Sequence, residues 1–258
     1  MPYRLLYTLP AALLVLVACA GHATEQGCAA DRTDERARVE TIYDGDTIRL
    51  ADGRKLRLIG LDAPEMGRNG AASQPYAEQA RTRLQALLAR QQFILLRYDA
   101  GRQDRYRRTL AHVYLEDGRS VTALLIEQGL ATSLAVPPDL WNHTCYQAAE
   151  QRARAARRGI WSLPAYQPVE STALAADSEG FHRIRGRVTR VGESRKSIWL
   201  KLEGNVALRI ARDDLHYFST APTQLRGRTL TVRGWPHTDS RGQRVVRVRH
   251  PAALELMD

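Results

Sequence analysis

A short segment in the first quarter of the chain combines several carboxylates with an arginine on a predicted strand. The residues concerned, all within positions 42–65, are Asp44, Asp46, Asp62, Glu65 and Arg57. Carboxylates that crowd together repel one another unless a cation or a proton compensates their charge. An Asp-Gly turn explains one aspartate at a time, but it does not explain the set. Hard oxygen ligands suit Ca²⁺ or Mg²⁺, and a guanidinium beside a bound cation favours phosphate. The segment therefore predicts a cation site next to a phosphate site.

Short strands and three helices must position these residues. From Ala37 apolar and polar residues alternate, with turns at Asp44-Gly45 and Asp52-Gly53 that are typical of hairpins. Asp62 follows Asp46 by sixteen positions, so a hairpin can bring the two together. Further strands are predicted at 92–99 and 109–121. Apolar periodicity and end signals predict helices at 75–91, at 120–131 with Ser120 as N-cap and Gly129 as stop, and at 142–159.

The C-terminal region predicts a second β-rich unit. An aperiodic linker at 163–179 is rich in Pro, Ser, Ala and Glu. Five short strands and one helical turn follow it, which suggests a small Greek-key barrel. The predicted strands are 181–191, 197–203, 206–212, 226–235 and 244–249, and the helical turn is 213–218.

One face of this unit collects basic side chains and a tryptophan. Trp199 and Lys201 lie opposite the apolar residues of the same predicted strand. Other strands add arginines to the polar side: Arg183, Arg185, Arg187, Arg209, Arg233, Arg247 and Arg249. Such a face suits single-stranded nucleic acid. An ordinary solvated face that keeps sheet edges soluble is the alternative.

Net charge and the N-terminus bear on partners and location. The 258 residues suffice for one large or two small domains, and their formal charge of +10 favours nucleic acid, anionic lipid or an acidic substrate. Residues 1–20 are predicted to be a signal peptide. Two cleavage signals compete, because Ala18-Cys19-Ala20 fits a small-x-small site whereas residues 16–19 resemble a lipobox that would lead to acylation of Cys19. Both imply export, to the periplasm, the cell envelope or the extracellular space.

Cysteine usage agrees with export. The chain has three cysteines, and Cys19 is either removed with the signal peptide or lipidated. Cys28 and Cys145 remain, an even number in an oxidising compartment, and we predict a disulfide between them. Two free buried thiols are the alternative. No close pairing of Cys or His matches the spacing of a zinc site.

Several ordered motifs resemble the staphylococcal (micrococcal) nuclease family. The segments "IYDGDTIRL", "RLIGLDAPE", "DRYRRTLAHVY", "EQGLA" and "GIW" carry the resemblance, which covers about residues 37–162. It implies an OB-fold five-stranded barrel with a Ca²⁺-dependent phosphodiesterase site. The expected fold is therefore mainly β with helices (α+β), the nuclease barrel being followed by a second small OB-like β-barrel. The expected parts are 1–20 signal peptide, 21–36 N-terminal segment, 37–162 nuclease-like domain, 163–179 linker and 180–258 OB-like domain.

The same resemblance implies roles for individual residues. Asp46, Asp62 and the main-chain carbonyl of Ala63 would bind the cation, with Asp44 behind them as a supporting acid. Glu65 would orient or deprotonate the attacking water, and such a base can contribute roughly 10²–10⁴-fold. Arg57 and Arg108 would bind the scissile phosphate, and Tyr106 would line the nucleotide pocket. Trp199 and Lys201 are added as substrate-binding residues from the basic face of the C-terminal unit.

Two departures from the family pattern bear on the site. The residue before the phosphate arginine is usually Gly but is Arg107 here, which leaves Arg107 as a rival to Arg108. The loop after "EQGLA", residues 132–139, lacks the tyrosines that relatives use to contact a nucleotide. The expected function is an exported Ca²⁺-dependent phosphodiesterase that hydrolyses DNA and RNA with little sequence specificity. The alternative is a catalytically impaired nuclease-fold module that binds nucleic acid or a protein partner.

Overall fold

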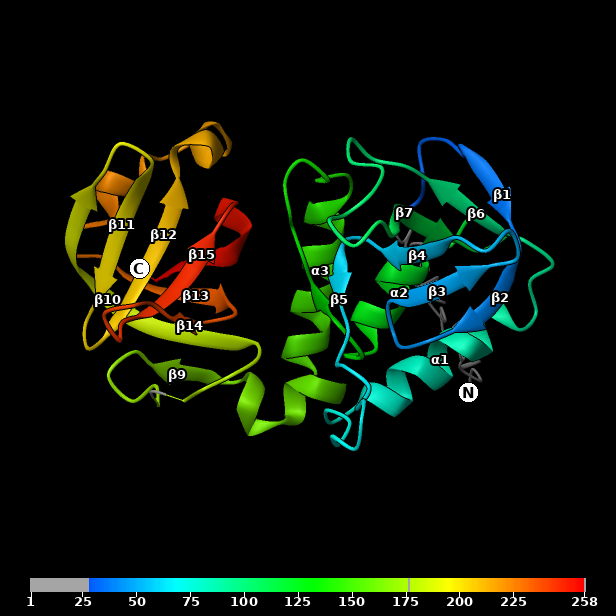
Figure 1. Cartoon of the computed structure of the whole chain (residues 1–258), viewed down its shortest axis with the longest axis horizontal. Helices are drawn as coiled ribbons and strands as arrows, with labels where there is room; N and C mark the ends of the chain where they lie inside the picture. The colour runs from blue at the N-terminus through cyan, green and yellow to red at the C-terminus, as the bar shows by residue number, and fades with distance from the viewer. Residues whose placement is uncertain (1–27, 176, 258) are drawn as a thin grey trace, which may run out of the picture.

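The computed structural model describes residues 28–175 and 177–257. The predicted signal peptide and Cys19 lie outside these residues. Two sheets, each with its own apolar core, form two lobes that lie side by side (Figure 1). We call residues 28–158 the first lobe and residues 168–175 and 177–257 the second lobe. Two 3-10 helices, η1 (Gly159–Ser162) and η2 (Pro164–Tyr166), connect them.

The first lobe is built on a six-stranded sheet in the order β1-β6-β7-β4-β3-β2. Its strands are β1 (Glu35–Ala37), β2 (Val39–Ile42), β3 (Thr47–Leu50), β4 (Lys55–Leu58), β6 (Ile94–Arg97) and β7 (Thr109–Tyr114). A separate pair joins β5 (Leu61–Asp62) to β8 (Thr132–Ser133). The three helices are α1 (Ala77–Leu88), α2 (Val121–Glu127) and α3 (His143–Ala155).

The end signals of the helices explain where they stop. The Ser120 hydroxyl accepts the Ala123 N–H at 3.2 Å, as predicted for an N-cap. Gly129 has a φ of 68° and lies just beyond α2, which confirms it as a stop. The third helix is shorter than predicted and ends at Ala155 rather than near Gly159. Arg157 and Gly159 both have positive φ, 50° and 53°, which no α-helix accommodates.

The second lobe is built on an eight-stranded sheet. Its strands are β9 (Pro168–Glu170), β10 (His182–Glu193), β11 (Ser197–Leu202), β12 (Val206–Ala211), β13 (Thr229–Gly234), β14 (His237–Thr238), β15 (Arg244–Val248) and β16 (Leu254–Met257). Three short helices, η3 (Arg212–Tyr217), η4 (Pro222–Leu225) and η5 (Pro251–Ala253), lie between them. All five strands predicted from the sequence are present. The predicted linker differs from expectation, because β9 lies inside it and pairs with β10.

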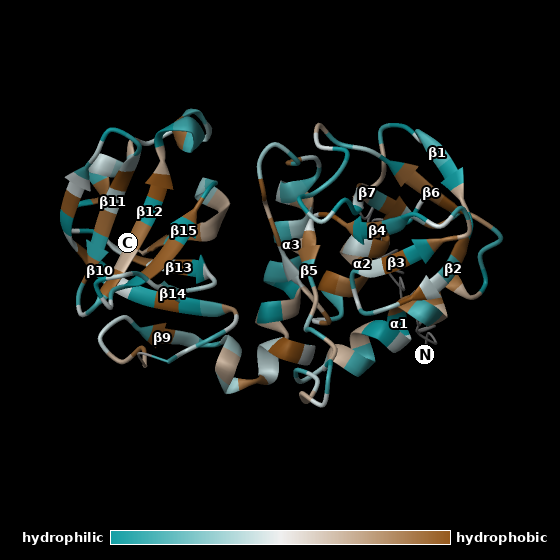
Figure 2. Cartoon of the chain, viewed as in Figure 1, coloured by the Kyte–Doolittle hydropathy of each residue, from teal (hydrophilic) through white to brown (hydrophobic). Residues whose placement is uncertain are grey.

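Closed barrels are not confirmed in either lobe. Over the described residues, the strand pairing in each sheet follows an open order. In the first lobe the two end strands of the sheet, β1 and β2, are consecutive in the chain and are separated only by Arg38. The chain therefore connects the two ends of the sheet, although β1 and β2 are not paired by hydrogen bonds. The fold is therefore mainly β with helices. Apolar residues recur along the strands of both sheets (Figure 2), and each lobe buries its own apolar cluster. No helix among the described residues is long and apolar enough to cross a membrane.

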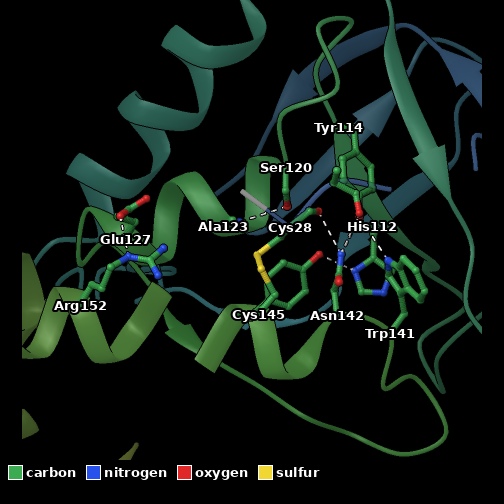
Figure 3. The surroundings of a disulfide bond; sticks show 12 residues. Cys28, His112, Tyr114, Ser120, Ala123, Glu127, Trp141, Asn142, Cys145 and Arg152 are labelled. Carbon is green, nitrogen blue, oxygen red and sulfur yellow. Dashed lines mark hydrogen bonds and ion pairs between the residues drawn. A yellow bond between two sulfur atoms is a disulfide. The ribbon is translucent and has the colours of Figure 1, made fainter. Parts of the chain in front are cut away.

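The predicted disulfide links α3 to the N-terminal segment of the first lobe, residues 28–34, which we call the strap. Cys28 and Cys145 are bonded, which confirms the pairing. Next to it, the Asn142 side-chain amide donates to the Cys28 carbonyl at 3.0 Å and lies 3.4 Å from the Tyr114 hydroxyl (Figure 3). Behind this cluster His112 is buried and its Nδ1 lies 3.0 Å from the Tyr146 hydroxyl, so that histidine has a structural role.

Buried ion pairs join the two lobes. Arg233 of β13 contacts both carboxylate oxygens of Glu150 in α3, at 2.5 and 2.9 Å. Glu255 of β16 similarly accepts from Arg154 of α3 at 2.7 Å and from Arg183 of β10 at 2.9 Å. The sequence placed Arg183 and Arg233 on an exposed basic face. That assignment is wrong for both, because α3 covers this part of the second sheet (Figure 1).

Neutralising Glu150 should weaken the docking of the lobes. Glu150→Gln leaves the Arg233 guanidinium buried without its counter-charge, so we expect the free energy of unfolding to fall by about 3 kcal/mol. Denaturant unfolding followed by tryptophan fluorescence measures the free energy of unfolding of the variant and of the wild type. The control is Glu127→Gln, which removes a partly exposed partner of Arg152 and should cost less than about 1 kcal/mol. Equal costs for the two variants would contradict a role for the buried pair in docking.

Candidate active site

The Asp44-Gly45-Asp46 turn between β2 and β3 lies against the start of the chain segment that follows β5. The Asp46 N–H donates to Asp44 Oδ1 at 3.0 Å, which fixes the turn. A Cβ atom on Gly45 would lie 2.6 Å from the Ala63 Cβ and 2.8 Å from the Ala80 Cβ. Only glycine permits this approach. Because Gly45 has no side chain, the turn can approach Ala63 closely, and Asp46 lies beside Ala63.

Asp46, Arg57 and Asp62 converge at this point. Asp46 is buried, and its Oδ2 accepts the Ala63 N–H at 3.0 Å and lies 2.7 Å from Arg57 Nη1. Arg57 Nη2 lies 3.0 Å from Asp62 Oδ1. The antiparallel register of β3 and β4 pairs Thr47 with Arg57, which explains why Asp46 and Arg57 are neighbours. The convergence of Asp46 and Asp62 predicted from their spacing is present.

The cluster holds more negative than positive charge. Burial raises the pKa of Asp46 to about 7, against the opposing effect of Arg57 and with reinforcement from Asp44 and Asp62. Burial likewise raises the pKa of Asp62 to about 6, again opposed by Arg57. Asp44 is also buried, and its only ion pair within the described chain is a long one of 3.8 Å with Arg68. One nearby arginine does not balance three carboxylates.

The donor chemistry fits a hard, weakly held cation. Within residues 28–175 and 177–257 no group of three or more His, Cys, Asp or Glu side chains is arranged to enclose a metal ion. Asp46 and Asp62 offer two carboxylates, and the adjoining Ala63 carbonyl is a further oxygen donor. All three are hard ligands, and their excess negative charge would be neutralised by a divalent ion that completes its shell with water. These residues suit Ca²⁺ or Mg²⁺ better than a softer metal.

Glu65 lies three residues beyond Asp62 on a fixed stretch of backbone. Its N–H donates to Gln74 Oε1 at 2.9 Å, and its carbonyl accepts the Gln74 N–H at 2.9 Å. The side chain is exposed and is in no ion pair with another described residue. Its charge raises the pKa of Asp62, after burial, which places the two carboxylates near each other. Glu65 and Asp62 border the same cavity.

The two predicted phosphate arginines line one cavity. Arg57 and Arg108 both border a cavity of about 240 Å³, whereas Arg107 does not. Asp104 orients Arg108 by accepting its Nε–H at 2.7 Å. Arg107 has a φ of 63°, the conformation that the family's usual glycine would permit, and a side chain there costs about 1–2 kcal/mol. The geometry favours Arg108 over Arg107 as the second arginine.

Tyr106 projects from the turn before Arg108. Its ring is 65% exposed, and the Arg108 guanidinium lies 5.6 Å from the ring centre. A tyrosine in that position can contact a nucleotide next to the arginine. Its neighbour Arg105 donates to its hydroxyl at 2.7 Å.

The connector between the lobes and the second lobe contribute residues that the sequence did not identify as part of this site. A cavity of about 270 Å³ is bordered by Asp62 and Glu65 on one side and by Tyr166, Phe181 and Trp235 on the other. Burial and the charge of Asp62 raise the pKa of Tyr166 to about 12. In the sequence, Trp235 stands out only as an aromatic residue between Gly and Pro in "RGWP". No nearby residue in the sequence indicates that Trp235 lies close to Asp62.

Trp199 and Lys201 lie elsewhere on the second lobe. They border a cavity of about 670 Å³ together with Arg190 and Arg241. No residue of that cavity also borders the cavity with Asp62 and Glu65. Asp46 contacts Arg57 and Arg57 contacts Asp62. Arg108 shares a cavity with Arg57, and Glu65 shares another with Asp62. Trp199 and Lys201 border neither of these two cavities.

Comparison with known proteins agrees with this arrangement. Residues 55–163 match the model of a family described as staphylococcal nuclease homologue. The chain is 34% identical over 134 residues to a thermonuclease of Staphylococcus intermedius, covering 51% of this chain and 79% of that protein. It is 33% identical over 133 residues to a thermonuclease of Staphylococcus hyicus, covering 50% of this chain and 77% of that one. It is also 35% identical over 133 residues to the endonuclease YncB of Bacillus subtilis, covering 50% and 62%.

Proposed function

The chain belongs to the staphylococcal nuclease family and is a nuclease, and from this premise we propose that it is an exported Ca²⁺-dependent phosphodiesterase acting on DNA and RNA. The observation that carries the proposal is the convergence of Asp46, Arg57 and Asp62 beside the free carboxylate of Glu65. Phosphate contacts carry no base information, so a site of this kind has little sequence specificity.

The residues divide the chemistry among themselves. Asp46, Asp62 and the Ala63 carbonyl would hold the divalent ion, which when bound supplies positive charge against the phosphate oxygens. Arg57 and Arg108 bind the same phosphate from the side of their shared cavity and stabilise the charge that develops during attack. Glu65 accepts the proton of the attacking water. The water oxygen forms a bond to phosphorus while the phosphorus–oxygen bond to the leaving nucleotide breaks, and the leaving oxygen takes a proton from solvent.

Metal removal tests the dependence on Ca²⁺. Purified mature protein should digest single-stranded DNA and RNA with millimolar Ca²⁺, stop when a chelator is in excess, and resume when Ca²⁺ is restored. Parallel reactions with Mg²⁺ and Zn²⁺ identify the preferred ion. Digestion that continues under chelation would refute the metal requirement. Binding without digestion at millimolar Ca²⁺ would favour the impaired binding module instead.

Export is supported by the Cys28–Cys145 bond, because disulfides persist in oxidising compartments. We place the protein in the periplasm, the cell envelope or the extracellular space, with possible anchoring through a lipidated Cys19. Secretion of the mature chain and metabolic labelling of Cys19 with a fatty-acid analogue would separate the two predicted processing signals.

Strand connectivity supports an OB-like interpretation of the second lobe. In the first lobe β4 pairs in parallel with β7, and in the second lobe β12 pairs in parallel with β15. The long strand β10 pairs with both β11 and β13, as the consecutive strands β1 and β2 together pair with β6 and β3. We therefore infer a nuclease-like domain at 37–162 and a second OB-like domain at 180–258.

A further inference from the structure

Two cavities between the lobes share an aromatic wall. The first, described above, contains Asp62 and Glu65; we call it the catalytic-side cavity. The second, of about 260 Å³, contains Arg247 and Arg249; we call it the basic cavity. Phe181 and Trp235 border both. A chain leaving the catalytic-side cavity along this wall would therefore enter the basic cavity.

Trp235 is a supported but exposed aromatic surface. It follows β13 directly, is 43% exposed, and has Phe181 packed edge-on against it with ring centres 5.5 Å apart. Phe181 in turn stacks on Tyr166 at 5.8 Å, and Tyr166 packs against the buried Trp161. The indole is thus held in place by a series of aromatic rings that reaches Trp161 in η1, between the lobes. A base that stacks on its free face would need little ordering of the protein.

The basic cavity has the charge that a nucleic acid backbone requires. Arg247 of β15 is exposed and has no ion pair with another described residue. Arg249 is only 3.8 Å from its nearest carboxylate, Asp214. No Asp or Glu borders the cavity. Arg233 also borders it, but its charge is already balanced by Glu150.

The route offers an aromatic surface, Phe181 and Trp235, followed by two basic side chains, Arg247 and Arg249, and a single strand carries bases and phosphates that suit the two. Stacking requires an open base face, which a single strand offers and a duplex does not. The loop at 132–139, which has no aromatic residue of its own, packs here through Leu134 and Val136 and borders the basic cavity. The aromatic surface missing from that loop is therefore supplied by the second lobe.

We propose that single-stranded nucleic acid, cleaved at Arg57 and Glu65, continues across Trp235 into the basic cavity, with a base on the indole and phosphates on Arg247 and Arg249. This subsite rests on the proposed nuclease function, since it starts from the phosphate held there. It also replaces Trp199 and Lys201 as the place where the second lobe contacts substrate.

The first test measures binding without cleavage. A fluorescein-labelled oligothymidylate of about ten nucleotides is titrated in chelator and followed by anisotropy. Trp235→Ala should raise Kd by about 5- to 100-fold, and Trp235→Phe by much less, because a base stack is worth roughly that factor. Arg247→Ala should reduce the salt slope of log Kd by about one. The control Arg226→Ala, an exposed second-lobe arginine that borders neither cavity, should change neither quantity.

The second test compares two substrates with Ca²⁺ present. The ratio of kcat/KM for the oligothymidylate to that for a thymidine dinucleotide should fall by about 5- to 100-fold in Trp235→Ala, mainly through KM. A wild-type protein that cleaves, with Trp235→Ala and Arg247→Ala matching it in Kd and in this ratio, overturns the subsite but not the nuclease function. A wild-type protein that binds without cleaving refutes the function, while weaker binding by Trp235→Ala still supports the subsite. Weaker binding by Trp199→Ala alone would place the strand on the other face and overturn the proposal.

Discussion

Replacing Glu65 by glutamine should lower kcat by about 10²–10⁴-fold, the contribution of a positioned general base. Glutamine keeps the shape of the side chain but cannot accept a proton. The main-chain bonds to Gln74 that hold this residue do not involve the substituted atoms. The Glu65 side chain is exposed and in no ion pair with another described residue, so the free energy of unfolding should stay within about 0.5 kcal/mol of wild type. Steady-state kinetics and denaturant unfolding measure the two quantities.

The kinetic profile distinguishes a base from a residue that only positions water. If Glu65 takes the proton, Glu65→Gln should lose the dependence of log kcat on pH that the wild type shows. The control Glu78→Gln, at the exposed start of α1, should leave both the profile and kcat unchanged. A loss smaller than about tenfold in Glu65→Gln, with the pH profile kept, would contradict the role of base.

Removing the disulfide should lower the free energy of unfolding by up to about 5 kcal/mol. The bond closes a loop of 117 residues, and in the chain-entropy account a loop of this length restricts the unfolded chain by about that amount. The strap keeps other contacts, since Asp31 accepts from Arg97 at 3.0 Å and Asp34 from the Tyr98 N–H at 2.8 Å. The variant Cys28→Ser with Cys145→Ser should therefore fold, but with a lower denaturation midpoint.

Wild-type protein unfolded with and without reductant provides the matched comparison. Reduced wild type should approach the double variant, and each single Ser variant should resemble the double variant in non-reducing buffer. Identical midpoints for oxidised and reduced wild type would show that the bond contributes nothing to stability. Neither Cys28 nor Cys145 borders the cavities that contain Arg57 and Glu65, so the folded variant should keep its nuclease activity.

The catalytic cluster is local enough in sequence to be predicted. The hairpin of β3 and β4 lies between Asp46 and Asp62 in the sequence, and Asp-Gly dipeptides mark its turns. The pairing of β3 with β4 then positions Arg57 beside Asp46. Hairpin register depends on turn type and on alternation of apolar residues, both of which are visible in the chain itself. The same reasoning located the Ser120 cap, the Gly129 stop and the five main strands of the second lobe.

The sequence by itself determined the local elements, the convergence of Asp46 and Asp62 on Arg57 and the Cys28–Cys145 pairing. Tertiary structure alone decided that Arg183 and Arg233 are covered beside α3, that Arg108 rather than Arg107 borders the cavity with Arg57, and that Trp235 borders the same cavity as Asp62. Alternation along a strand reveals which side chains share a face, but not what covers that face. The covering surface comes from helix α3, 83 positions before Arg233. Contacts between residues so far apart in the sequence depend on how the two folded lobes pack against each other. A local sequence pattern does not predict that packing.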